Sequence, residues 1–147
     1  MKLVIGSDHA GFALKQELLA DLTEKGYTLS DAGTYNEDSA DYPLYGEKIA
    51  RIVVSGQADL GIAVCGTGIG IGISANKVKG CRAVMCSEPY SAKMGREHNN
   101  ANVLALGSRV VGTELAKMIV AAFLKANFLG ERHARRVQMI DDIEQRN

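Results

Sequence analysis

Cys65 is the residue of the chain that most strongly indicates chemistry. It stands where an apolar run from Leu60 ends and where glycines begin at positions 66, 68, 70 and 72. Glycine lets the backbone turn sharply with its N–H groups uncovered, and a helix starting in such a loop favours both an anion and a thiolate. Cysteine alone is more often a small buried hydrophobe, but alternate glycines build little core. The stretch therefore predicts a base or nucleophile beside a set of backbone donors.

The glycines fit the general phosphate-loop patterns poorly. No Gly-Lys-Ser/Thr follows them, which excludes a Walker loop. The segment 70–75 matches the relaxed dinucleotide pattern, but it begins several residues after the expected strand ends. A nucleotide-binding or sensory module without catalysis is thus the alternative from a different functional class.

Other candidate groups lie apart from Cys65 in the sequence. Asp8 and His9 follow an N-terminal apolar run; they are either a carboxylate and an imidazole for a hydroxyl or phosphate, or a cap and a loop residue. His98 suits proton donation, although a histidine at a helix end is often only a partner of the helix dipole. Arg132 and Arg136 are four residues apart, so they share a helix face that either grips a phosphate or is merely solvated. The remaining histidine, at position 133, points off that face and is given no role.

Composition limits the partners and the compartment that the chain can have. The chain has 147 residues, and its 17 basic residues balance its 17 acidic ones, which gives no indication of nucleic acid or an anionic membrane as partner. No apolar run approaches the ~18 residues of a membrane span, so a cytoplasmic protein is expected. The cysteines have no metal-ligand spacing and indicate neither a disulfide nor a metal; two of them are interpreted as structural, namely Cys81 and Cys86.

The elements that must position these groups alternate along the chain. Apolar runs predict strands over residues 2–5, 27–31, 60–64, 82–85 and 103–106. Helices are expected at 12–26 and 42–55, at 71–78, at 88–97 with Ser87 as N-cap, and at 131–143; a further amphipathic helix is indicated by Leu115, Met118, Ile119, Ala122 and Phe123. Regular alternation implies one domain, with a five-stranded parallel sheet and helices on both faces.

This topology brings separate candidates to one place. Asp8 and His9 follow the first strand, Cys65 and Thr67 the third, and Arg109 the fifth. Ligands of parallel sheets bind beyond the carboxyl ends of the strands. Three loops should therefore open onto one shared rim.

Four segments give the chain a resemblance to a known family. They are Gly6–Phe12 (GSDHAGF), Cys65–Gly70 (CGTGIG), Glu97–Asn102 (EHNNAN) and Leu106–Arg109 (LGSR). In this order they are similar to type B ribose-5-phosphate isomerase, within a family that includes galactose-6-phosphate and allose-6-phosphate isomerases. The resemblance covers essentially the whole chain. It implies a Rossmann-like three-layer sandwich, a homodimer or dimer of dimers, and an active site shared across the interface, with the C-terminal helix contacting a partner subunit.

The resemblance also implies roles for residues. Cys65 would move a proton between the first two sugar carbons, assisted by Thr67, and His98 would be the acid that opens the ring. Some relatives instead place a glutamate at the position of Ile71, so this chain is of the cysteine type. The implied substrate contacts are Asp8 at the hydroxyls; Gly66, Thr67, Gly68, Ile69 and Gly70 at the enediolate; His9, Arg132 and Arg136 at the phosphate; and Asn99 and Arg109.

The expected reaction is the interconversion of ribose 5-phosphate and ribulose 5-phosphate, with no cofactor and no metal. It proceeds by deprotonation next to a carbonyl, and fixed backbone donors stabilise the oxyanion that develops, by ~3 kcal/mol per donor. A six-carbon substrate, galactose 6-phosphate or allose 6-phosphate, is the alternative within the class. Sugar length would then be set near Tyr42 and the neighbouring loops.

Overall fold

The computed structural model describes residues 1–147 as a five-stranded parallel sheet between helices, as predicted. The strand order is β2-β1-β3-β5-β4. The strands are β1 (Lys2–Ser7), β2 (Thr28–Asp31), β3 (Leu60–Cys65), β4 (Ala83–Met85) and β5 (Val103–Gly107). The helices are α1 (Phe12–Glu24), α2 (Tyr42–Val54), α3 (Ile69–Ala75), α4 (Pro89–Asn99), α5 (Thr113–Lys125) and α6 (Arg132–Gln145).

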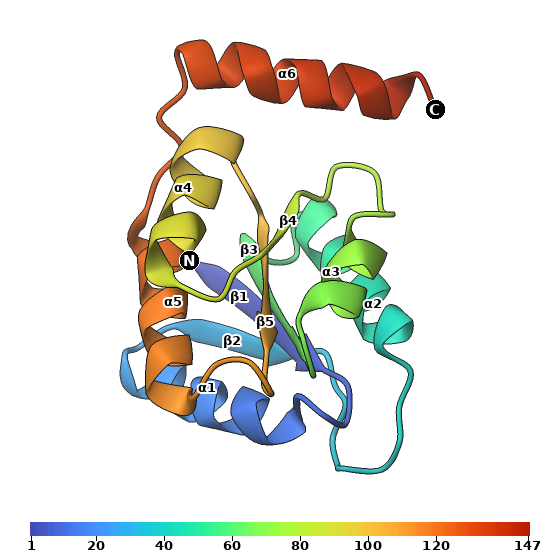
Figure 1. Cartoon of the computed structure of the whole chain (residues 1–147), viewed down its shortest axis with the longest axis vertical. Coiled ribbons are helices and arrows are strands. Elements are labelled where there is room, and N and C mark those ends of the chain that lie inside the picture. The colour runs from blue at the N-terminus through green and yellow to red at the C-terminus, as the bar shows by residue number, and fades with distance from the viewer.

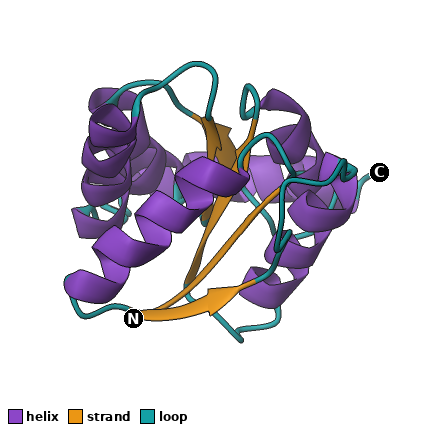
Figure 2. Ribbon diagram, turned by 90° about the horizontal axis from the view of Figure 1, so that it is seen from below, coloured by secondary structure: helices purple, strands orange, loops and turns teal.

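Two apolar clusters, one on each face, hold the layers together. α1, α4 and α5 pack on one face and α2 and α3 on the other, as the two helix layers of Figure 2 show. Side chains alternate along β3, so that Ile62 joins the first cluster and Ala63 and Cys65 join the second. Every residue of β3 is buried. The apolar run before Cys65 is therefore the central strand of the core.

Two local predictions were wrong. The N-cap of α4 is Glu88 rather than Ser87, because Pro89 occupies the first turn and the Glu88 carboxylate accepts the Ser91 N–H at 3.0 Å. The buried face of α5 is also shifted by one position. Ile119 and Phe123 are buried as predicted, but Leu115 and Met118 are exposed, and the buried face is completed by Ala116, Val120 and Leu124.

Helix α6 stands apart from both layers. It crosses the end of the molecule at which the strands start, as Figure 1 shows in red. Its polar side-chain contacts there are with Gly80 and Arg82, which precede β4. The carboxyl edge of the sheet, where Cys65 lies, is thus at the opposite end from α6.

Candidate active site

Cys65 ends β3 directly beneath the glycine loop. Its side chain is 4% exposed, and its Sγ accepts the backbone N–H of Gly68 at 3.1 Å. Gly68 has φ +79°, a left-handed conformation that other residues rarely adopt, and it caps α3, which begins at Ile69. The expected helix start inside the glycine run is confirmed. The sulfur consequently meets a backbone donor at the tip of the strand.

Two other glycines of the loop have a packing reason. A Cβ on Gly70 would lie 2.6 Å from the ring of Tyr42, and one on Gly72 would lie 2.7 Å from Cγ of Met85. At such distances a side chain would force α3 away from its neighbours. The expectation that these glycines contribute nothing to packing is wrong, because they bring α3 close to the sheet and to α2.

Asp8 and His9 fix the first loop of the rim. Asp8 is buried, and its Oδ1 accepts the N–H of Gly11 at 3.0 Å while its own N–H donates to the Val64 carbonyl at 3.2 Å. The Nδ1 of His9 accepts the N–H of Ala40 at 3.1 Å, which leaves Nε2 as the free ring nitrogen. Both residues therefore have structural contacts and still stand beside the strand that carries Cys65.

The loop after β5 closes over the glycine loop after β3. The N–H of Ser108 donates to the Cys65 carbonyl at 2.9 Å, and the N–H of Arg109 donates to the Gly66 carbonyl at 3.0 Å. The guanidinium of Arg109 is exposed and passes beside Gly66. Thr67 is exposed, and its Oγ1 accepts the Ile69 N–H at 3.2 Å. The structure thus brings the three loops together, as the topology predicted.

A buried lysine supports this rim, and the sequence reasoning missed it. Lys15 is 0% exposed; its Nζ lies 2.7 Å from Asp31 Oδ1 and donates to the Thr34 carbonyl. The Asp31–Thr34 segment continues into the loop that contacts His9. A signal was available, because Lys15 lies three residues before Leu18, on the apolar face of α1.

The other candidates lie at the amino edge. His98 and Asn99 end α4, and Arg132 and Arg136 are exposed on α6. The structure does not bring this group to Cys65 within one chain. His133 lies off the arginine face, as expected. The sequence reasoning gave it no role, but it is buried and its ring stacks on that of His98.

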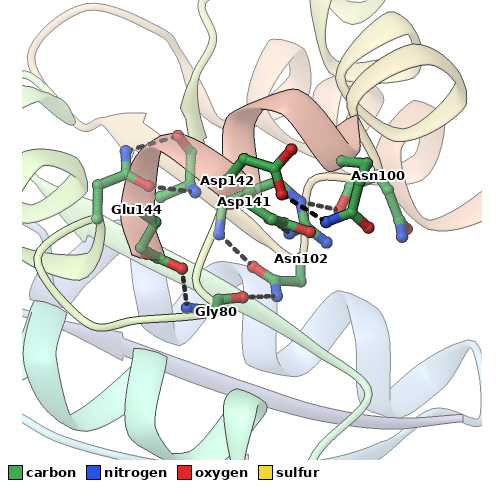
Figure 3. A network of polar contacts seen from close by, with 10 residues as sticks. Gly80, Asn100, Asn102, Asp141, Asp142 and Glu144 are labelled. Atoms are coloured by element: carbon green, nitrogen blue, oxygen red, sulfur yellow. Dashed lines mark hydrogen bonds and ion pairs between the residues drawn. The ribbon is translucent and has the colours of Figure 1, made fainter. Parts of the chain in front are cut away.

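A polar network fastens α6 to the amino edge (Figure 3). Arg82 Nη1 lies 3.0 Å from Asp141 Oδ1, and Glu144 accepts the N–H of Gly80 at 3.0 Å. Asn102 bridges the two attachment points, accepting the Arg82 N–H at 2.7 Å and donating to the Gly80 carbonyl at 2.9 Å. The orientation of the arginine pair is therefore set by side chains rather than by the sheet.

The remaining thiols differ from Cys65. Burial raises the pKa of Cys81 to about 12 and that of Cys86 to about 11. Both stay protonated at neutral pH, in agreement with a structural interpretation. No cluster of three His, Cys, Asp or Glu side chains is arranged to bind a metal, and no helix is long and apolar enough to cross a membrane.

A parallel sheet with a thiol, a carboxylate and an imidazole at its carboxyl edge has the architecture of an α/β enzyme. The family model described as "Ribose/Galactose Isomerase" matches residues 3–140. The chain therefore belongs to the ribose/galactose isomerase family and is an isomerase, which removes the non-catalytic nucleotide module as an alternative.

Individual relatives extend the match over nearly the full length. Ribose-5-phosphate isomerase B of Escherichia coli is 55% identical over 145 residues, 99% of this chain and 97% of the relative. The structure of Clostridium thermocellum ribose-5-phosphate isomerase B superposes with a TM-score of 0.98 at 54% identity, covering 99% of each chain. The structure of a ribose 5-phosphate isomerase from Thermotoga maritima superposes with a TM-score of 0.94 at 48% identity, covering 96% of this chain and 97% of that one. The fold is accordingly that of the type B ribose-5-phosphate isomerases.

Proposed function

We propose that the protein interconverts D-ribose 5-phosphate and D-ribulose 5-phosphate. The observation that carries the proposal is the meeting of Cys65 with the glycine-loop amides at the carboxyl edge, in a chain of this family. Because this substrate is a charged sugar phosphate, a cytoplasmic location is proposed as well. The interconversion of these two sugars would place the enzyme in the pentose phosphate pathway.

The chemistry follows from an enediolate intermediate. The thiolate of Cys65 removes the proton from C2 of the open-chain aldose, and the electrons move to the C1 oxygen. The same sulfur returns the proton to C1, and the O2 proton passes to the C1 oxygen, which leaves a ketone at C2 and a hydroxyl at C1. Backbone amides from Gly66 to Gly70 stabilise the developing charge, Thr67 assists, and Asp8 binds the hydroxyls.

Ring opening precedes this step, because ribose 5-phosphate is predominantly a furanose. His98 donates a proton to the ring oxygen as its bond to C1 breaks, and the C1 hydroxyl releases its proton to solvent as the aldehyde forms. His9, Arg132 and Arg136 bind the phosphate, with Asn99 and Arg109 as further contacts. These assignments follow the family resemblance residue by residue.

We further propose that each active site is shared by two copies in a homodimer or a dimer of dimers. In one chain, Cys65 and Arg109 lie at the carboxyl edge, while His98 and the arginine pair lie at the amino edge. α6 also exposes Met139, Ile140 and Ile143, apolar groups that a second copy would cover.

The decisive assay uses ribose 5-phosphate in the presence of a chelator. Turnover is expected without metal, and Cys65→Ala should lower it by at least about 10³-fold. The variant should also stop deuterium exchange from solvent into C1 of ribulose 5-phosphate, while ribose 5-phosphate still raises its Tm. Activity of Cys65→Ala near that of the wild type would refute the base assignment.

A six-carbon sugar phosphate is the second candidate, because the family description also covers galactose. The ring of Tyr42 lies against Gly70 at the rim, where it would limit the length of the sugar. Rates measured side by side on ribose 5-phosphate, galactose 6-phosphate and allose 6-phosphate decide between them. A higher kcat/KM for either hexose phosphate would replace the pentose proposal.

A further inference from the structure

Two of the three histidines of the chain lie face to face. His98, on the last turn of α4, and His133, on the first turn of α6, have ring centroids 4.1 Å apart and planes within 8° of parallel. Rings stacked this closely are in van der Waals contact across their faces. Each ring therefore restricts the side-chain rotation of the other.

The surroundings of His133 disfavour a positive charge on its ring. His133 is 6% exposed, and its pKa lies below the ordinary value, first because burial disfavours the charged ring and then because His98, Arg132 and Arg136 are positive neighbours. Glu131 acts in the opposite direction but is the smallest influence. Two imidazolium rings in contact would also repel each other. Burial and the positive neighbours therefore both favour the uncharged form of the His133 ring.

We propose that His133 is a positioning residue for ring opening: its ring is an aromatic surface, stacked on His98, that fixes the plane of the imidazole that acts as the acid. This inference rests on the proposed role of His98 as the acid. It extends that role to a neighbour whose ring is stacked on the acid and would act on the sugar only through it.

The structural alternative is that His133 merely anchors α6. The helix offers a matched control, because Val137, one turn further on, is its only other buried residue. Val137→Ala loosens the same helix without removing the stacked ring. His133→Phe keeps an aromatic face of similar shape but carries no proton.

Substrate choice isolates the step in question. Ribulose 5-phosphate cannot close a furanose ring, because its C5 oxygen is esterified, so deuterium exchange at its C1 needs Cys65 but no ring opening. We expect His133→Ala to lower kcat on ribose 5-phosphate by about tenfold, while C1 exchange and KM change by less than about twofold. His133→Phe should restore most of kcat, and Val137→Ala should leave the ratio of the two rates unchanged. Equal losses of turnover and exchange in His133→Ala, or the same selective loss in Val137→Ala, would overturn the proposal.

A second measurement does not depend on activity. Proton NMR of the imidazole signals is tractable with three histidines, each assigned by its own substitution. The pKa of His133 should lie below the ordinary histidine value, and His98→Asn should raise it because a positive neighbour is lost. A His133 pKa at or above the ordinary histidine value, or no response to His98→Asn, would overturn the inference even if the wild type isomerises ribose 5-phosphate. Coupled titration in a protein that does not turn over ribose 5-phosphate would instead refute the proposed function, and with it the positioning role.

Discussion

The two edges of the sheet hold their candidate groups in different ways. At the carboxyl edge, Cys65 and its neighbours belong to short loops that are joined to one another by backbone hydrogen bonds and supported by the buried Lys15. At the amino edge, the candidate groups are side chains on α4 and α6, and α6 is attached by polar side chains. The difference teaches that the groups at the carboxyl edge are held by the backbone of the sheet and its loops, whereas the groups proposed to bind phosphate depend on side-chain contacts and face outward.

The largest change in activity should come from pairing a chain with a defective carboxyl edge and a chain with a defective amino edge in one dimer. Cys65→Ala and His98→Asn should each be nearly inactive on ribose 5-phosphate. If the sites are shared, a heterodimer of the two variants has one intact site. Co-expression with two affinity tags should then restore about a quarter of wild-type activity in the mixture, because half of the dimers carry one intact site out of two.

A pair of variants from the same edge is the control. Cys65→Ala co-expressed with Asp8→Asn damages the carboxyl edge of both chains, so every site stays defective and no recovery is expected. Recovery in this control as well, or none with Cys65→Ala and His98→Asn in isolated heterodimers, would contradict the sharing of sites.

The next largest effect concerns stability at the carboxyl edge. Lys15→Met should lower the free energy of unfolding by about 3 kcal/mol, because it leaves the partly buried Asp31 carboxylate and the Thr34 carbonyl without their donor. Denaturant titration measures the loss. Lys25→Met is the matched variant, since Lys25 forms an exposed pair with Asp21, and it should cost less than about 1 kcal/mol. Equal losses in the free energy of unfolding would mean that the buried Lys15–Asp31 pair does not stabilise the carboxyl edge.

The carboxyl edge was the more predictable of the two. Strand and helix periods determine the topology, and the topology places the ends of β1, β3 and β5 side by side, so the convergence of Asp8, Cys65 and Arg109 followed from local patterns. The family resemblance then assigned roles that spacing alone did not.

The rest depends on contacts between distant residues. Lys15 pairs with Asp31 on another element, and the stacking of His98 on His133 requires the position of α6, which is set by Arg82 and its partner 59 residues away. No periodicity encodes such docking. The closely packed glycines were misinterpreted for the same reason, because the neighbour that excludes a side chain is visible only in three dimensions.

The smallest effect tests whether the polar attachment of α6 matters for binding. Asp141→Asn removes the charge facing Arg82, which lies 3.0 Å away in a partly exposed pair, so the loss of stability should be only about 0.5–1 kcal/mol. Because α6 also carries Arg132 and Arg136, KM for ribose 5-phosphate should nevertheless rise about threefold, with kcat changed by less than about twofold. Asp142→Asn, whose carboxylate contacts only Gln138 on the same helix, should change neither. A rise in KM for both variants would point to overall charge rather than attachment. An unchanged KM in Asp141→Asn would show that this ion pair does not position the arginine pair, so that the other contacts of α6 must hold the amino edge.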